Sequence, residues 1–241
     1  MKRRRKRRKV PGVVWIAIIV VLILFSRTLT VKKWVLQAKG TPKNLIELVE
    51  RQPEAYRFAK HYKKNKGQNQ KIDVSSEVKK GTIPSFIQWD ERWGYHYYGS
   101  DYMAITGCAP TCLSMVYCGL KGDSEWHPLK MAAWAQRNHY YIKGVGTDWS
   151  FLSRGAKKLG LQVQQISPST EKLKKELSDG KVAICSMKQG DFTSSGHFIV
   201  CSKMGWTGKI TVCDPNSLKR SKKTWTANQL VSQMKQMWVY Q

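Results

Sequence analysis

Acidic residues are scarce in this 241-residue chain: 16 Asp and Glu stand against 42 Lys and Arg, giving a formal net charge of +26. Eight of the first nine residues are Lys or Arg, so part of the excess belongs to a basic tail, residues 1–9. Such a chain favours anionic partners, namely membrane lipid head groups, acidic cell-wall polymers or nucleic acids. The sequence has no zinc-finger spacing, no RNA-binding aromatic motif and no basic helix followed by heptads, so we do not expect a nucleic-acid partner.

Charge is also missing from residues 10–26, an uncharged run of 17 residues rich in Ile, Val and Leu. A membrane helix needs roughly 17–25 such residues, so we predict a transmembrane anchor here. The basic tail before it predicts a cytoplasmic N-terminus, with the rest of the chain outside the cytoplasm. The alternative is a cleaved signal peptide. It is disfavoured because no small-x-small site follows Phe25 closely, and Leu36-Gln37-Ala38 has a poor residue at its first position.

The sequence after this run divides into two regions of different residue pattern, residues 27–80 and residues 81–241. Residues 27–80 predict a helical stalk and a polar linker, with Thr41 as a helix N-cap and Pro53 interrupting the apolar pattern. Residues 81–241 predict one α+β domain, because helical patterns come first and strand patterns gather towards the end. Besides a helix beginning near Cys108, helices are predicted at 127–138, 148–159 (N-cap Thr147) and 171–178 (N-cap Thr170), and strands at 161–166, 181–187, 197–203, 209–213 and 236–240.

Cys108 stands at the start of a helical pattern. Pro110 fits a first helical turn, where its missing N–H would have no intrahelical partner, and Gly119 is a candidate helix end. The free N–H groups and positive dipole at a helix N-terminus favour thiolate over thiol, and the thiolate is the nucleophilic form of cysteine. Cys108 is therefore a candidate nucleophile. The alternative, a small buried side chain in a core helix, is equally supported by this stretch alone.

The chain has six cysteines, which an oxidising compartment would allow to pair. Three lie on the short helix at Cys108, and the others replace apolar residues in strand patterns, so we interpret all except Cys108 mainly as small core residues. A disulfide of Cys201 with Cys213, or one that involves Cys185, stays open. The six are Cys108, Cys112, Cys118, Cys185, Cys201 and Cys213.

A nucleophilic cysteine needs a base, and the base needs an orienting partner. Of the five histidines, His197 stands out because it begins an apolar strand pattern; we interpret the other four as surface or packing residues. The strands 197–203 and 208–214 flank a four-residue loop, a common hairpin length. If Lys203 pairs with Gly208, His197 lies directly opposite Asp214, with Cβ atoms roughly 4.5–5.5 Å apart. The alternative for Asp214 is a plain strand-ending turn.

Four blocks occur in order along the chain. The blocks are Gln88-Trp89-Asp90 with Arg92-Trp93, Gly107-Cys108-Ala109-Pro110-Thr111, Gly196-His197-Phe198-Ile199 and Asp214-Pro215-Asn216. With these blocks, the chain from about Gly81 to Gln241 is similar to the cysteine peptidase family 39-like domains, relatives of the double-glycine leader peptidases of bacteriocin export. The stalk also resembles that of membrane-anchored members from Gram-positive bacteria.

The resemblance implies a papain-like α+β fold, with Cys108 as nucleophile, His197 as general base and Asp214 as its orienter. It also implies that Gln88 donates to the oxyanion, beside the Cys108 backbone N–H. In papain-like enzymes this glutamine commonly lies six residues before the cysteine, where this chain has Tyr102. Gln88 lies twenty residues before Cys108, so its role depends on the intervening loop folding back.

We therefore expect a membrane-anchored, extracytoplasmic cysteine peptidase that hydrolyses peptide or protein substrates by acyl transfer to water. No transporter or nucleotide-binding pattern occurs in these 241 residues, so we do not expect leader removal during export. The chemistry needs no metal or cofactor, and a Cys-x₃-Cys spacing at a helix start is a weak indication of zinc. Two alternatives stay open: a cell-wall peptide amidase with the same triad, and an inactive papain-like binding module.

Overall fold

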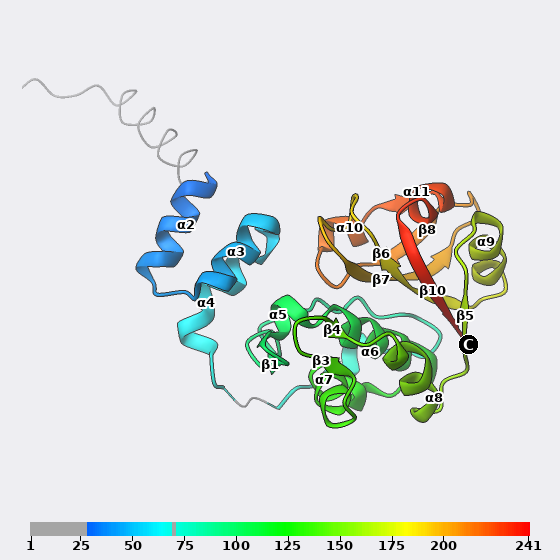
Figure 1. Cartoon of the computed structure of the whole chain (residues 1–241), viewed down its shortest axis with the longest axis horizontal. Coiled ribbons are helices and arrows are strands. Elements are labelled where there is room, and N and C mark those ends of the chain that lie inside the picture. The colour runs from blue at the N-terminus through cyan, green and yellow to red at the C-terminus, as the bar shows by residue number, and fades with distance from the viewer. Residues whose placement is uncertain (1–27, 69–70) are drawn as a thin grey trace, which may run out of the picture. The chain divides into compact units, whose positions relative to one another are not determined.

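The computed structural model describes residues 28–68 and 71–241, and the chain divides into two compact parts, residues 1–63 and residues 64–241 (Figure 1). Within the two described stretches, no helix has the length and apolar character that crossing a membrane requires. The predicted anchor, residues 10–26, and the basic tail before it lie outside the described residues.

The described portion of the first part is helical. It contains α2 (Leu29–Ala38), α3 (Lys43–Arg51) and α4 (Tyr56–Asn65), with a 3₁₀ turn at Pro53–Ala55 after α3. Pro53 interrupts the helices as predicted. The predicted N-cap at Thr41 is wrong, because Thr41 Oγ1 donates to the Ala59 carbonyl at 3.3 Å and Pro42 occupies the N-cap position.

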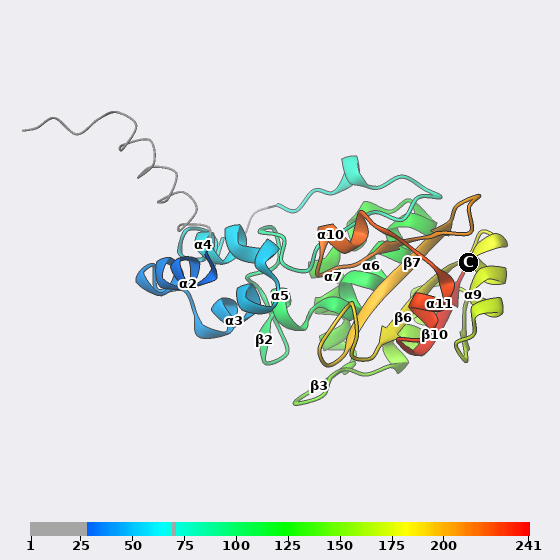
Figure 2. The same ribbon diagram turned by 90° about the horizontal axis from the view of Figure 1, so that it is seen from above.

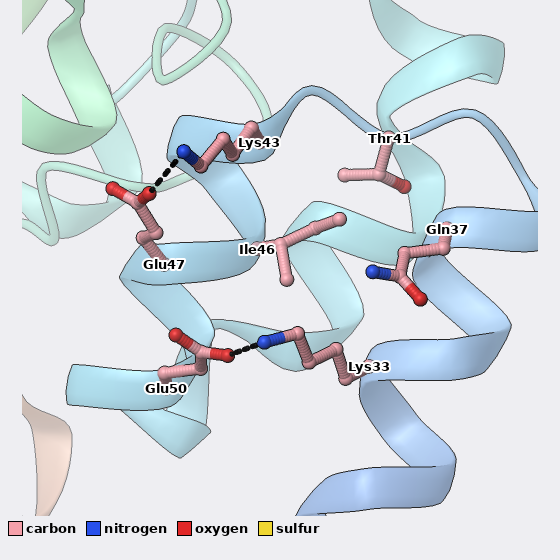
Figure 3. A pocket seen from close by; sticks show the side chains of 7 residues that line it. All are labelled: Lys33, Gln37, Thr41, Lys43, Ile46, Glu47 and Glu50. Carbon is pink, nitrogen blue, oxygen red and sulfur yellow. Dashed lines mark ion pairs between the residues drawn. The ribbon is translucent and has the colours of Figure 1, made fainter.

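A pocket of about 400 Å³ opens between α2 and α3 (Figure 3). Two ion pairs line it, Lys33–Glu50 at 2.6 Å and Lys43–Glu47 at 3.8 Å between nitrogen and oxygen. Exposed pairs of this kind typically contribute about 0–1 kcal/mol. Because the two lysines and two glutamates balance each other, the pocket favours neither an anionic nor a cationic ligand.

The second part begins with a helical half centred on α6 (Cys108–Lys121), which packs against α7 (Pro128–Arg137) and against the sheet. Ten of the fourteen residues of α6 are buried, so it is a core helix. Val74, from the predicted linker, is also buried in this core. The other elements here are α5 (Met103–Thr106), a π-helical turn (Phe151–Gly155) leading into α8 (Ala156–Lys158), and the hairpins β1–β2 (Tyr97–Tyr98, Asp101–Tyr102) and β3–β4 (Tyr141–Ile142, Gly146–Thr147).

The other half is an antiparallel sheet with strand order β5-β10-β6-β7-β8-β9. Its strands β6, β7 and β10 are labelled in Figures 1 and 2. Helix α6 packs on one face, and α9 (Thr170–Ser178) with α11 (Ala227–Val231) packs on the other. Strand β6 is buried at all six positions because both faces are covered. The strands are β5 (Val163–Ile166), β6 (Val182–Met187), β7 (His197–Met204), β8 (Ile210–Cys213), β9 (Thr224–Trp225) and β10 (Met234–Tyr240).

All five predicted strands are present within a few residues of their predicted bounds, and the α+β class is confirmed. The predicted end of α6 at Gly119 is wrong: the helix continues to Lys121, and Gly122 ends it with φ 72°. Gly119 serves a packing role instead, since a Cβ there would lie 2.6 Å from Ile83 Cδ1 and 2.9 Å from the Thr82 carbonyl oxygen.

Two predicted N-caps are also displaced. Ser169, rather than Thr170, caps α9 by accepting the Lys172 N–H at 3.1 Å. Thr147 belongs to β4, and Asp148 after it accepts the Ser150 N–H at 2.7 Å. In both cases a neighbouring residue has an equally suitable side-chain oxygen, so sequence alone did not distinguish them.

The β7–β8 hairpin is present, but its predicted register is wrong. The loop covers residues 205–209, and Val200 lies opposite Cys213, whereas the prediction placed it opposite Thr211. The observed register also shifts within the hairpin, because Ser202 is an extra residue between two paired positions. Such a bulge places two residues of one strand opposite one residue of its partner.

This bulge determines whether the Asp214 side chain lies on the same side of the hairpin as His197. Continued past β8, the register beyond the bulge places position 214 opposite Ile199, two residues from His197. Alternate residues of a strand share a side, so Asp214 falls on the side of His197. The register near the turn would have placed Asp214 on the opposite side, so Ser202 restores the alignment.

Candidate active site

Cys108 is the first residue of α6, and Gly107 separates it from α5. A Cβ at position 107 would lie 2.5 Å from the Met103 carbonyl oxygen and 2.7 Å from its Sδ, so only glycine fits without displacement. The Gly107 N–H donates to Met103 O at 2.9 Å, and Thr111 N–H donates to Gly107 O at 3.0 Å. The first N–H groups of a helix have no intrahelical acceptor, so that of Cys108 is suited to bind an anionic oxygen.

His197 begins β7, and Asp214 is the first residue after β8. His197 Nε2 lies 2.8 Å from Asp214 Oδ1, and both side chains are buried, at 6% and 0% exposure. Cys108 lines the same cleft as His197, and its interaction with the ring helps to raise the pKa of His197. The structure thus brings together the nucleophile, base and orienter named from the sequence.

Two further donors hold the Asp214 carboxylate. The Asn216 N–H donates to Oδ1 at 2.7 Å, and Arg220 Nε–H donates to Oδ2 at 2.5 Å. The Asp214 N–H in turn donates to Ser221 Oγ at 2.9 Å. Sequence reasoning missed Arg220, because it stands in a basic run that gave no sign of a buried partner.

The charges of the buried pair support each other. Burial alone lowers the pKa of His197, but the Asp214 carboxylate and then Cys108 outweigh it and raise the pKa to about 9. Burial alone raises the pKa of Asp214, but His197 and then Arg220 outweigh it, so this pKa falls below its ordinary value. At neutral pH the fold therefore favours an imidazolium beside a carboxylate.

Cys108 differs from the other five cysteines because it is half-buried, whereas they are buried. Burial raises the pKa of Cys112 well above its ordinary value and that of Cys213 to about 11, so both are unreactive thiols. All six are free thiols, including Cys185 and Cys201, whose Sγ atoms lie 3.7 Å apart. Cys112, one turn after Cys108, packs in the core beneath it.

Gln88 lies beside the segment that leads into Cys108, so the loop does fold back. Its Nε2 donates to the Ala104 carbonyl at 2.8 Å and, over a longer 3.4 Å, to the Ile105 carbonyl. Gln88 is 2% exposed, and its Oε1 has no hydrogen-bond partner among the described residues. The donor that an oxyanion would need thus points at backbone carbonyls in this state.

The same segment is tied to the turn after β8. The Gln88 N–H donates to the Pro215 carbonyl at 2.7 Å, and Trp89 Nε1–H donates to the Asn216 carbonyl at 3.1 Å. These bonds join the Gln88-Trp89-Asp90 and Asp214-Pro215-Asn216 blocks, which are far apart in the sequence. The position of Asp214 therefore depends on both.

A cleft of about 690 Å³ opens over Cys108 and His197. The β3–β4 hairpin and the residues after it contribute exposed apolar side chains to the lining, namely Ile142, Val145 and Trp149. Sequence analysis missed this hairpin because its strands are only two residues long each. Cys108 and His197 both line this cleft, so the thiol and the imidazole face the same space.

Most of the second part of the chain is similar to known proteins. The model of the Peptidase C39 like family matches residues 80–241. The chain is similar to the peptidase domain of Streptococcus ComA, described as a bifunctional ABC transporter involved in a quorum-sensing pathway, at 17% identity and a TM-score of 0.42, covering 56% of this chain and 89% of that one. It is also similar to a C39-like peptidase from Bacillus anthracis, at 16% identity and a TM-score of 0.36, covering 72% and 98% respectively. Among curated proteins, none matches the chain.

Proposed function

The chain belongs to the Peptidase C39 like family, and we propose that it is a cysteine peptidase whose triad is Cys108, His197 and Asp214. The observation that carries the proposal is the 2.8 Å bond between His197 Nε2 and Asp214 Oδ1, at a cleft that Cys108 also lines. A cysteine at a helix start, paired with an oriented histidine in an open cleft, is an arrangement suited to acyl transfer.

The proposed reaction has two halves. His197 holds the proton of Cys108, and Sγ attacks the carbonyl carbon of a peptide bond. As the C–N bond breaks, the imidazolium gives its proton to the leaving amine, which leaves a thioester on Cys108. A water molecule then loses a proton to His197, attacks the thioester and releases the carboxylic acid and the thiol. Asp214 keeps the ring in one tautomer throughout.

The oxyanion formed in each half needs donors. The Cys108 backbone N–H at the start of α6 supplies one. We propose Gln88 Nε2 as the other, supported by its contact with Ala104 just before the nucleophile. Its 3.4 Å bond to Ile105 is the weaker of its two bonds, so it is the one more easily given up when the side-chain amide turns towards an oxyanion.

We further propose that residues 10–26 anchor the peptidase in a membrane, with the catalytic part outside the cytoplasm. The support is the 17-residue uncharged run and the eight basic residues before it. Protease added to intact spheroplasts should digest the catalytic part of the full-length chain. Full protection of that part, with digestion after lysis, would contradict this orientation.

The activity is tested with a peptide library whose members carry a thiol-reactive group, applied to the folded full-length protein. We expect covalent labelling of wild type and of Cys112→Ala, and none of Cys108→Ala. Labelling that survives Cys108→Ala but not Cys112→Ala would show that the nucleophile is misassigned. No labelling of folded wild type would favour the inactive binding module.

A cell-wall peptide amidase with the same triad is the second candidate. The formal net charge of +18 on residues 10–241, beyond the basic tail, favours it, since a basic surface suits anionic wall polymers. Digestion of purified peptidoglycan, compared with digestion of the peptide library, separates the two. Release of wall peptides without cleavage of library peptides would assign the amidase.

A further inference from the structure

The second oxygen of Asp214 has a charged partner of its own. Oδ1 is shared by His197 Nε2 and the Asn216 N–H, while Oδ2 accepts from Arg220 Nε. The Arg220 side chain is 19% exposed and Asp214 is fully buried. Arginine is costly to withdraw from water unless it is paired, so its place here calls for an explanation.

Arg220 is held in place from several sides. It lies on the short helix α10 (Leu218–Ser221), where its N–H donates to Ser217 Oγ at 3.1 Å. Its carbonyl accepts from Trp225 Nε1–H at 3.2 Å. Among the described residues Asp214 is the one acid within ion-pair distance of Arg220. The arginine is thus built into the turn and directed at the orienter.

We propose that Arg220 is a positioning residue, which counter-charges Asp214 and thereby sets how strongly His197 holds its proton. This inference rests on the proposed triad. A carboxylate with an arginine on its far oxygen attracts a proton on the neighbouring imidazole less strongly than a carboxylate alone. The ring then remains acidic enough to protonate a leaving amine.

The other charges around His197 do not replace this contribution. Cys108 faces the ring from α6, and Asp148 and Lys235 line the same cleft. Arg220 acts from the opposite side, through the carboxylate. Its removal leaves the negative charge of Asp214 uncompensated, so the His197 ring binds its proton more tightly. An imidazolium that holds its proton more tightly is a poorer general acid. Removal of Arg220 should therefore lower kcat and leave KM, which reports substrate contacts, unchanged.

The test follows the histidine ring signals of the full-length protein by NMR through a pH titration, with His197 assigned from a His197→Gln variant. We expect Arg220→Met to raise the pKa of His197 by roughly one pH unit. Arg220→Lys should keep it near the wild-type value. The matched control is Lys222→Met, which removes an exposed charge two residues away and should leave the titration unchanged. Thermal melting shows which variants are folded.

An unmoved or lowered titration in folded Arg220→Met would overturn the proposal, as would an equal shift in Lys222→Met. If Arg220→Met does not fold, Arg220→Gln takes its place with the same expectation, and loss of folding in both would assign Arg220 a purely structural role. The titration needs no substrate. A protein that shows the expected shift but cleaves no peptide would therefore refute the proposed activity and leave the role of Arg220 standing.

Discussion

Replacement of Asp214 by asparagine should reverse the charge preference of His197. The pKa of this ring rises from the ordinary 6.5 to about 9, with Asp214 as the largest favourable cause and burial opposing it. A tenfold change in proton affinity corresponds to about 1.4 kcal/mol, so the charged ring is favoured by on the order of 3 kcal/mol. Asparagine keeps the shape but not the charge. Burial then dominates, and we expect the pKa of His197 to fall below 6.5 in Asp214→Asn.

The change is large enough to measure in two ways. At pH 7.5 less than about a tenth of the rings would then be protonated, against nearly all in wild type. We expect labelling of Cys108 by the thiol-reactive peptides to slow by at least about tenfold, and the NMR titration of His197 to move to acid pH. Asp179→Asn, which removes an exposed carboxylate paired with Lys175, is the matched control and should change neither.

Folding must be monitored separately in this variant, because Arg220 loses its partner. Breaking one side of a buried pair typically costs about 3–5 kcal/mol, so Asp214→Asn should melt well below wild type. Measurements below that melting point remain informative. A His197 titration still near 9 in the folded variant would refute the claim that Asp214 sets the charge of this ring.

Three further outcomes follow from the same geometry. The pKa of His197 is higher in the folded protein than in the unfolded chain, so protonation of this ring stabilises the fold. This stabilisation is complete below the unfolded pKa of 6.5 and disappears as the pH rises through the folded pKa of about 9. In urea melts, the stability advantage of wild type over His197→Gln should therefore shrink between pH 6.5 and about 9. Gly107→Ala, which drives a Cβ to 2.5 Å from Met103 O, should cost about 1–3 kcal/mol in the same melts, whereas Gly196→Ala, with open space around its Cβ, should cost little. Cys112→Ala should retain peptide labelling and lose roughly 1–2 kcal/mol of stability, since it empties a buried position.

The strands and the helix that begins at Cys108 could be predicted because their signals are local. The residues of β6 (Val182–Met187) are apolar except for Ser186, and Cys108 is followed by Pro110 in a first helical turn. Helix ends were less predictable, since Gly119 and Gly122 are both plausible ends. What decides between them is the close approach of Ile83 to Gly119, a tertiary contact that no local pattern encodes.

The hairpin register shows a different limit. The pairing of His197 with Asp214 was inferred from a four-residue loop, whereas the loop has five residues and the strand contains a bulge at Ser202. The inferred contact nevertheless forms, because the register beyond the bulge differs from the predicted one by two residues. An even difference keeps both side chains on one side of the hairpin. A serine within a strand pattern does not indicate a bulge, so the register of this hairpin could only be seen in the structure.

Asp214 connects the parts of the site that sequence spacing keeps apart. Its turn receives the N–H of Gln88, and its carboxylate receives His197 and Arg220. Gln88 in turn bonds to Ala104, four residues before the nucleophile. Segments around positions 88, 108, 197 and 214 are therefore linked by hydrogen bonds rather than by adjacency in the chain. This explains why motif order could predict which segments meet at the candidate site, while Arg220, which belongs to no motif, emerged only from the atoms around the carboxylate.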